Sequence, residues 1–79
     1  MPNVNHLLKK IRNYKIAYLL NDLEDIALRY VPDGDTYIVY AKQKGMPLYE
    51  EYEVDRYSNL VADAELFGSV LTKEQYENY

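Results

Sequence analysis

The chain contains no cysteine and no tryptophan, and its 79 residues include only one histidine, one phenylalanine, three glycines and three prolines. Without cysteine, neither disulfide bonds nor thiolate metal ligands can reinforce the fold. The scarcity of glycine and proline, together with 48% hydrophobic residues, excludes a disordered or low-complexity chain. We therefore expect residues 1–79 to form a single domain with a small core.

Long hydrophobic runs are missing as well. No apolar stretch approaches the roughly 20 residues of a membrane-spanning helix, and the N-terminus lacks the basic-then-apolar order of a signal peptide. These absences predict a soluble, cytoplasmic protein that does not contact membranes.

The residue types of common active sites are equally scarce. His6 is the only histidine, and neither Ser58 nor Ser69 stands in a nucleophile-elbow context. Asp33-Gly34-Asp35 lacks the alternating acids and the closing glutamate of a calcium-binding loop. We therefore expect no enzymatic activity, no metal and no cofactor.

Charge is distributed unevenly along the chain. Thirteen acids against nine bases give a net charge of −4, yet the first 20 residues carry four bases and no acid: Lys9, Lys10, Arg12 and Lys15. A net-negative body repels nucleic acid and attracts a basic protein surface. We expect the four bases to pair with acids of the same chain or of a second copy, and we expect no direct nucleic-acid contact.

The first third of the chain reads as two helices. Val4, Leu7, Leu8 and Ile11 predict a helix over residues 4–13 with Asn3 as a candidate N-cap. Apolar residues at 16, 19, 20, 23, 26, 27 and 30 favour a second helix over residues 15–31, with a break near Asn13 and Tyr14. A strand pair, 14–20 and 26–31, is the competing interpretation, although its turn lacks glycine and would expose Leu23.

The middle of the chain reads as a β-hairpin. Val31-Pro32-Asp33-Gly34-Asp35 is a stop signal, Thr36–Ala41 is rich in β-branched and aromatic residues, and Gln43-Lys44-Gly45 suits a three-residue loop leading into a strand over residues 48–54. That loop would pair Tyr40 with Leu48 and Ile38 with Glu50. A two-residue turn would shift the register by one, and a helical start at Leu48 is a further alternative.

The last third reads as two more helices. Ser58 or Asn59 would cap the first of them, its buried side would carry Leu60, Val61, Ala64 and Phe67, and Gly68 would end it. Thr72 and Gln75 resemble a capping box for a final short helix. The predicted fold is a small α+β domain in the order α-α-β-β-α-α, with helices packed on one side of a short antiparallel hairpin or sheet.

Ten tyrosines and a cluster of acids are the strongest functional signals. Tyrosine offers a large contact area with a polar end, which favours protein interfaces. Strand residues 51, 53 and 55 would share a face, about 6 to 7 Å apart, like successive phosphates of a nucleic-acid strand. The predicted partner-binding residues all belong to the hairpin and its end: Tyr37, Tyr40, Tyr49, Glu50, Glu51, Tyr52, Glu53 and Asp55.

These signals lead to two functional hypotheses. The first is a small, acidic, tyrosine-rich protein-binding domain whose partner has a basic surface. In its sharper form, the protein is an inhibitor of the phage or mobile-element accessory type that blocks a host nucleic-acid-handling protein by nucleic-acid mimicry. The alternative is a structural homo-oligomer with no inhibitory role.

Overall fold

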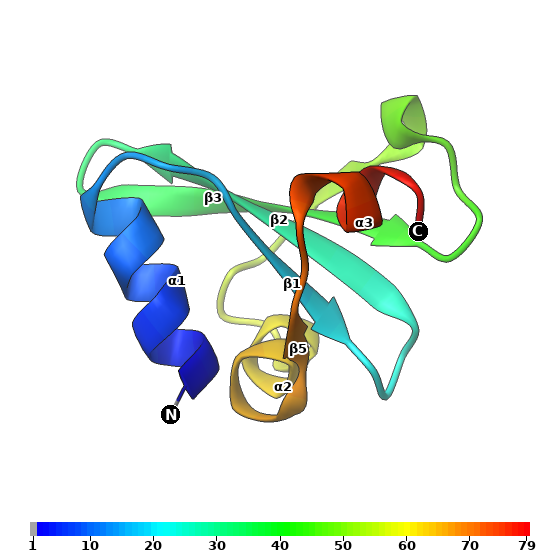
Figure 1. Cartoon of the computed structure of the whole chain (residues 1–79), viewed down its shortest axis with the longest axis horizontal. Helices are drawn as coiled ribbons and strands as arrows, with labels where there is room; N and C mark the ends of the chain where they lie inside the picture. The colour runs from blue at the N-terminus through cyan, green and yellow to red at the C-terminus, as the bar shows by residue number, and fades with distance from the viewer. Residues whose placement is uncertain (1) are drawn as a thin grey trace.

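In the computed structural model, which describes residues 2–79, α-helices lie on both sides of one five-stranded antiparallel sheet (Figure 1). The strands lie in the order β4-β3-β2-β1-β5. In chain order the elements are α1 (Pro2–Arg12), β1 (Ala17–Asn21), β2 (Ile26–Asp33), β3 (Thr36–Gln43), the 3-10 helix η1 (Leu48–Glu50), β4 (Tyr52–Val54), α2 (Asn59–Phe67), β5 (Ser69–Val70) and α3 (Lys73–Glu77). The α+β class is confirmed, whereas the predicted order α-α-β-β-α-α is wrong. Among the described residues, no helix is both long and apolar enough to cross a membrane.

The predicted first helix is present and ends where the break was expected. Tyr14 has a φ of 55°, and the amides of Tyr14 and Lys15 donate to the carbonyls of Ile11 (3.0 Å) and Lys10 (2.9 Å). This is a Schellman motif with tyrosine at the left-handed position that glycine usually fills. Asn3 lies inside α1, so its predicted role as N-cap is wrong. Its side-chain amide instead donates to Gly68 O (2.5 Å), which ties α1 to the end of α2.

Tyr14→Gly should stabilise the protein. A left-handed non-glycine residue costs about 1 to 2 kcal/mol, and the greater freedom of glycine when unfolded returns part of that, so we expect a net gain of about 0.5 to 1 kcal/mol in unfolding free energy. Tyr14 is 77% exposed, so little packing is lost. Urea denaturation of Tyr14→Gly beside Tyr14→Ala tests the cause, because alanine removes the ring and keeps the strain. Equal stability of the two variants would contradict it.

Residues 15–31 are not a helix. They form β1 and β2, which pair antiparallel with Leu19 opposite Leu28, so the competing strand-pair interpretation is the correct one. Asp25 adopts a φ of 53° and replaces the missing glycine of the turn. Asn21 Oδ1 accepts hydrogen bonds from the amides of Leu23 (3.0 Å) and Glu24 (3.1 Å). The turn leaves Leu23 70% exposed. The i, i+3, i+4 spacing of Leu23 with its apolar neighbours therefore does not reflect a buried helix face.

The strand over Thr36–Ala41 is confirmed as part of β3, but both predicted registers of the following hairpin are wrong. β4 has only three residues, and Tyr40 lies opposite Glu53 rather than Leu48. The chain between the strands is much longer than a tight loop. It contains the short 3-10 helix η1, so the helical alternative holds only for Leu48–Glu50 and the predicted strand over residues 48–54 only for Tyr52–Val54. Because β4 is short and pairs only with Val39, Tyr40 and Ala41, the start of β3 has no strand partner on that side among residues 2–79.

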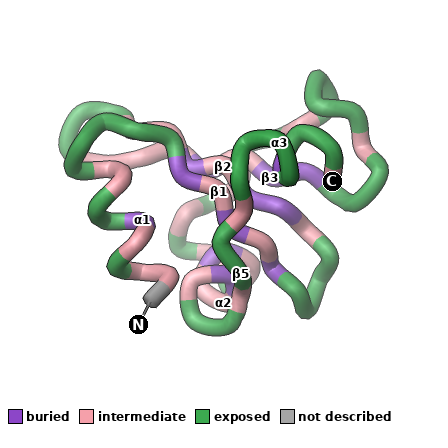
Figure 2. The backbone as a smooth tube through the Cα atoms, in the orientation of Figure 1, coloured by how far each residue is buried: buried purple, intermediate pink, exposed green. Residues whose placement is uncertain are grey.

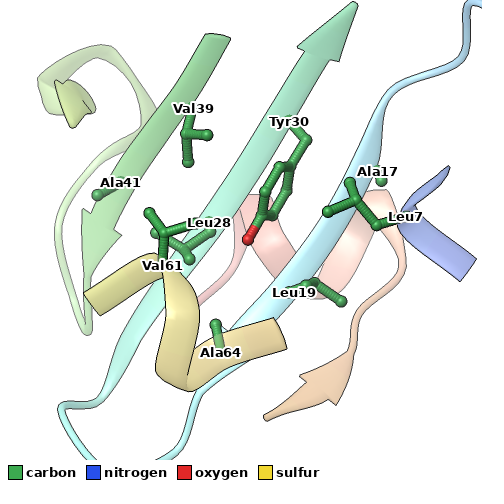
Figure 3. Close-up of a cluster of buried hydrophobic side chains, with 9 residues drawn as sticks. All are labelled: Leu7, Ala17, Leu19, Leu28, Tyr30, Val39, Ala41, Val61 and Ala64. Carbon is green, nitrogen blue, oxygen red and sulfur yellow. The ribbon is translucent and has the colours of Figure 1, made fainter. Parts of the chain in front are cut away.

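The core lies between one face of the sheet and the helices α1 and α2 (Figure 3). Its buried side chains come from five elements: Leu7, Ala17, Leu19, Leu28, Tyr30, Val39, Ala41, Val61 and Ala64. Ser58 caps α2 and Gly68 ends it, as predicted. Phe67, by contrast, is 68% exposed, so its predicted place in the core is wrong.

The other face of the sheet is partly covered by the C-terminal segment. The capping box is confirmed, since Thr72 and Gln75 exchange backbone-to-side-chain hydrogen bonds at the start of α3. Tyr76 of α3 is fully buried, and its ring lies 5.3 Å from that of Tyr18. Tyr18 alternates along β1 with the core residue Leu19, so α3 lies on the face opposite α1 and α2. The prediction that helices cover only one side of the sheet is wrong.

Candidate protein-binding surface

The eight predicted contact residues do not form one surface. Tyr37 lies on the core face of β3, whereas Tyr40 points to the opposite face because neighbouring strand residues alternate. The remaining six follow in the chain from η1 to the turn after β4: Tyr49, Glu50, Glu51, Tyr52, Glu53 and Asp55. They separate into an internal cluster around Glu51, an exposed tip around Tyr49, and a groove beside the start of β3.

The groove forms where β4 and β3 part. β4 pairs with β3 only at Val39, Tyr40 and Ala41, so among the described residues Thr36–Ile38 have a strand neighbour on one side only. After β4 the chain turns away, with the Ser58 amide donating to Asp55 O (3.0 Å) and the Tyr57 amide to Asp55 Oδ1 (2.9 Å).

The space between β3 and this turn has a volume of about 560 Å³. Ten residues line it, and together they define what we call the edge groove: Asp33, Thr36, Tyr37, Ile38, Val39, Glu53, Val54, Asp55, Arg56 and Tyr57. Three of them were predicted as contacts: Tyr37, Glu53 and Asp55. The groove therefore joins an unpaired strand edge to aromatic and acidic side chains.

Aromatic rings and one cation make up the wall of the edge groove. The guanidinium of Arg56 lies 4.8 Å from the ring centre of Tyr57 and 5.7 Å from that of Tyr37, and it donates to the Tyr57 hydroxyl (2.8 Å). Burial, followed by the charge of Glu65, raises the pKa of Tyr37, and Arg56 partly opposes this. Tyr57 is 78% exposed, so this wall has a large aromatic surface in contact with solvent.

Glu51 is not available to a partner. Its carboxylate accepts from Arg29 Nε (3.1 Å), from Arg29 Nη2 and from the Tyr76 hydroxyl (2.7 Å). Arg29 also lies over the Tyr40 ring, 4.6 Å from its centre. This cluster joins β2, the end of η1 and α3, and its role is to hold the C-terminal helix on the sheet.

Tyr49 and Glu50 project from the molecule on η1. Tyr49 is 87% exposed and Leu48 is 40% exposed, and Figure 2 shows the whole η1 turn as exposed. We call Leu48–Glu50 the tip. Tyr52 and Glu53 follow on β4, where both are exposed.

One buried polar pair joins β2 to α2. The Tyr30 hydroxyl donates to Glu65 Oε2 (3.4 Å), and burial raises the pKa of both groups. Tyr30 is 0% exposed, so a substrate could not reach its hydroxyl without opening the core (Figure 3). Within residues 2–79, no group of three His, Cys, Asp or Glu side chains is placed to hold a metal ion.

Arg56, Tyr57 and Asp33 line the edge groove and were missed in the sequence. Their meeting in one groove depends on how far β4 pairs with β3, which the local sequence does not show. The useful signal was the adjacent Arg56-Tyr57 pair, since arginine and tyrosine are enriched at interfaces. Comparisons with protein-family models, curated proteins and solved structures found no match to this chain.

Proposed function

We propose that this chain is a non-enzymatic protein-binding domain that takes an extended segment of its partner into the edge groove. The observation that carries the proposal is the unpaired side of Thr36–Ile38, which borders a 560 Å³ groove with tyrosine in its wall. An exposed strand edge offers unpaired backbone groups to an incoming strand, and side-chain pockets beside it supply specificity.

The charge of the groove indicates the charge of the partner. The lining has three exposed carboxylates, those of Asp33, Glu53 and Asp55. Arg56 is the one cation among the described residues of the lining, and it already lies against two tyrosine rings. A segment with lysine or arginine at alternate positions fits this arrangement, because alternate strand residues face the same side. The partner is therefore a protein with a basic segment.

Nucleic-acid mimicry has less support than simple protein binding. Mimicry needs a row of free carboxylates at residues 51, 53 and 55. Glu51 is paired with Arg29, and Asp55 binds the Tyr57 amide within its own turn. We therefore propose protein binding without requiring that the partner handle nucleic acid.

Selection from a random-peptide display library, with the purified protein as bait, tests the proposal. We expect the enriched peptides to carry alternating basic residues, and to slow hydrogen exchange of the amides in Thr36–Ile38 when bound. Glu53→Lys and Tyr57→Ala should each weaken binding about tenfold or more, the effect of losing an interface anchor or of placing like charges together.

Tyr49→Ala is the matched control, because it removes an even more exposed tyrosine that lies outside the edge groove. It should leave peptide affinity unchanged. Peptides that are acidic, or that bind without changing exchange in Thr36–Ile38, would overturn the proposal.

A further inference from the structure

A second surface lies between α1 and the segment that joins β5 to α3. Two adjoining hollows there, of about 300 and 370 Å³, share His6 and Lys10 in their linings. We call this surface the basic groove, defined by six residues: His6, Lys9, Lys10, Lys15, Ile16 and Val70. It shares no residue with the edge groove.

The basic groove has an unbalanced positive charge. In the part of the chain that the structure describes, no carboxylate lines either hollow, although the sequence has thirteen acids. The one ion pair within residues 2–79 joins Arg29 to Glu51, so the predicted pairing of the N-terminal bases with acids of the same chain is wrong. Burial, and then the charges of Lys10 and Lys9, lower the pKa of His6, which is consistent with a positive potential in the groove.

Between its cations the groove exposes apolar surface. Ile16 is 38% exposed and Val70 is 44% exposed, and both line the larger hollow. A ligand that matches the groove therefore combines negative charge with an apolar or aromatic side chain.

The tip has this combination. Glu50 is exposed, and it follows Tyr49 (87% exposed) and Leu48 (40% exposed) in one projecting turn. Figure 1 shows α1 and the tip at opposite ends of the longest dimension of the molecule, which is 30 Å. Leu48 of the tip and Ile16 of the basic groove line one hollow of about 350 Å³ in the same molecule. The tip therefore lies beside the apolar end of its own basic groove but far from Lys9 and Lys10 on α1.

We propose that the basic groove binds the tip of a second copy of this chain. Glu50 then lies among lysines, and Tyr49 covers the apolar surface at Ile16 and Val70. Nucleic acid fits less well, because everything after residue 20 carries five bases against thirteen acids and repels a long polyanion. The contact joins two different surfaces, so it either closes reciprocally in a two-fold dimer or repeats from copy to copy in a larger ring or an open chain.

Sedimentation velocity over a protein concentration series tests the contact. We expect the wild type to form concentration-dependent species larger than a monomer at about 50 mM salt and to dissociate at about 500 mM, because exposed charges are screened. Lys9→Glu/Lys10→Glu and Glu50→Lys should each weaken association at least about tenfold, since each places like charges together.

An equimolar mixture of these two variants is the decisive sample. The unchanged tip of Lys9→Glu/Lys10→Glu meets the unchanged groove of Glu50→Lys, and the reversed tip meets the reversed groove, whereas each variant alone brings like charges together. We expect association to return only in the mixture. Glu24→Lys, which reverses an exposed acid in the β1–β2 turn, is the charge-matched control and should associate like the wild type. A monomeric wild type at every concentration, or a mixture that stays monomeric, would overturn the proposal. So would a monomer that binds a labelled single-stranded oligonucleotide through Lys9 and Lys10, which would make nucleic acid the ligand.

Discussion

Gly68→Ala should destabilise the protein by about 3 kcal/mol or more, the largest effect we expect from any single added methyl group. A Cβ at Gly68 would lie 2.0 Å from Leu20 O and 2.7 Å from Ala64 O. Both atoms belong to the backbone, one in β1 and one in α2, so neither can rotate away. Relief requires α2 or β5 to move from the edge of the sheet.

The loss is large for a domain of this size. Small domains have a total stability of about 5 kcal/mol. Gly68→Ala should therefore unfold well below the melting temperature of the wild type, and its urea midpoint should be much lower. Circular dichroism during denaturation measures the change, and a variant that never folds would agree with it.

Gly34→Ala provides the matched comparison. Gly34 has a φ of +60°, and an added Cβ meets nothing within 4 Å, so the cost should be limited to left-handed strain of about 1 kcal/mol. If Gly68→Ala lowered the free energy of unfolding no more than Gly34→Ala, the close packing of Gly68 against Leu20 O would be contradicted.

The parts of the fold that could be predicted from the sequence are those fixed by local chemistry. Three features each depend on residues within a few positions: the Ser58 hydroxyl that accepts from the Val61 amide, the capping box of Thr72 and Gln75, and the strand beginning at Thr36. The interactions that stabilise these features join residues within about one turn of the chain, so the local sequence pattern is sufficient to predict them.

The prediction of a helix over residues 15–31 is wrong because the spacing of the apolar residues fits both an amphipathic helix and a strand pair. Leu19 and Leu28 are buried as cross-strand partners, and Leu23, which completed the helical stripe, is exposed in the turn. The turn depends on Asp25 in a left-handed conformation and on Asn21 as its acceptor. Aspartate and asparagine tolerate or support such turns, so the absence of glycine was weak evidence against a hairpin.

The candidate site was less predictable than the fold. The edge groove brings together Tyr37, Glu53 and Asp55. It does so only because β4 is short and pairs with the second half of β3, leaving the first half free. Register is a tertiary property, set by packing against both faces, and the loop residues did not determine it. Glu51 could not be separated from its neighbours without knowing that Arg29 of β2, beyond β3 in the sheet, reaches its carboxylate.

Glu51→Ala should destabilise the protein by about 2 kcal/mol, because it leaves a partly buried arginine and a buried tyrosine hydroxyl without their acceptor. The side chains of Arg29 and Glu51 are only 24% and 17% exposed. Combining Glu51→Ala with Arg29→Ala should cost less than the sum of the two single changes, since the second change removes a charge already left unpaired. Additive losses would show that the pair is not coupled.

The acid dependence of stability should change with the same residue. Burial acts to raise the pKa of Glu51, but the hydrogen bonds from Arg29 and Tyr76 outweigh it and hold the pKa below its ordinary value. A carboxyl with a lowered folded pKa contributes stability above its unfolded pKa and loses it as the pH falls through the folded pKa.

Glu65 has the opposite sign, because burial raises its pKa despite the Tyr30 hydrogen bond. Its contribution to stability is therefore present at low pH and is lost as the pH rises. Between about pH 6 and pH 3, Glu51→Ala should therefore lose less stability than the wild type and Glu65→Gln should lose more. Urea denaturation at each pH separates the two carboxyls, and an unchanged pH slope in Glu51→Ala would show that Glu51 is not held ionised by Arg29.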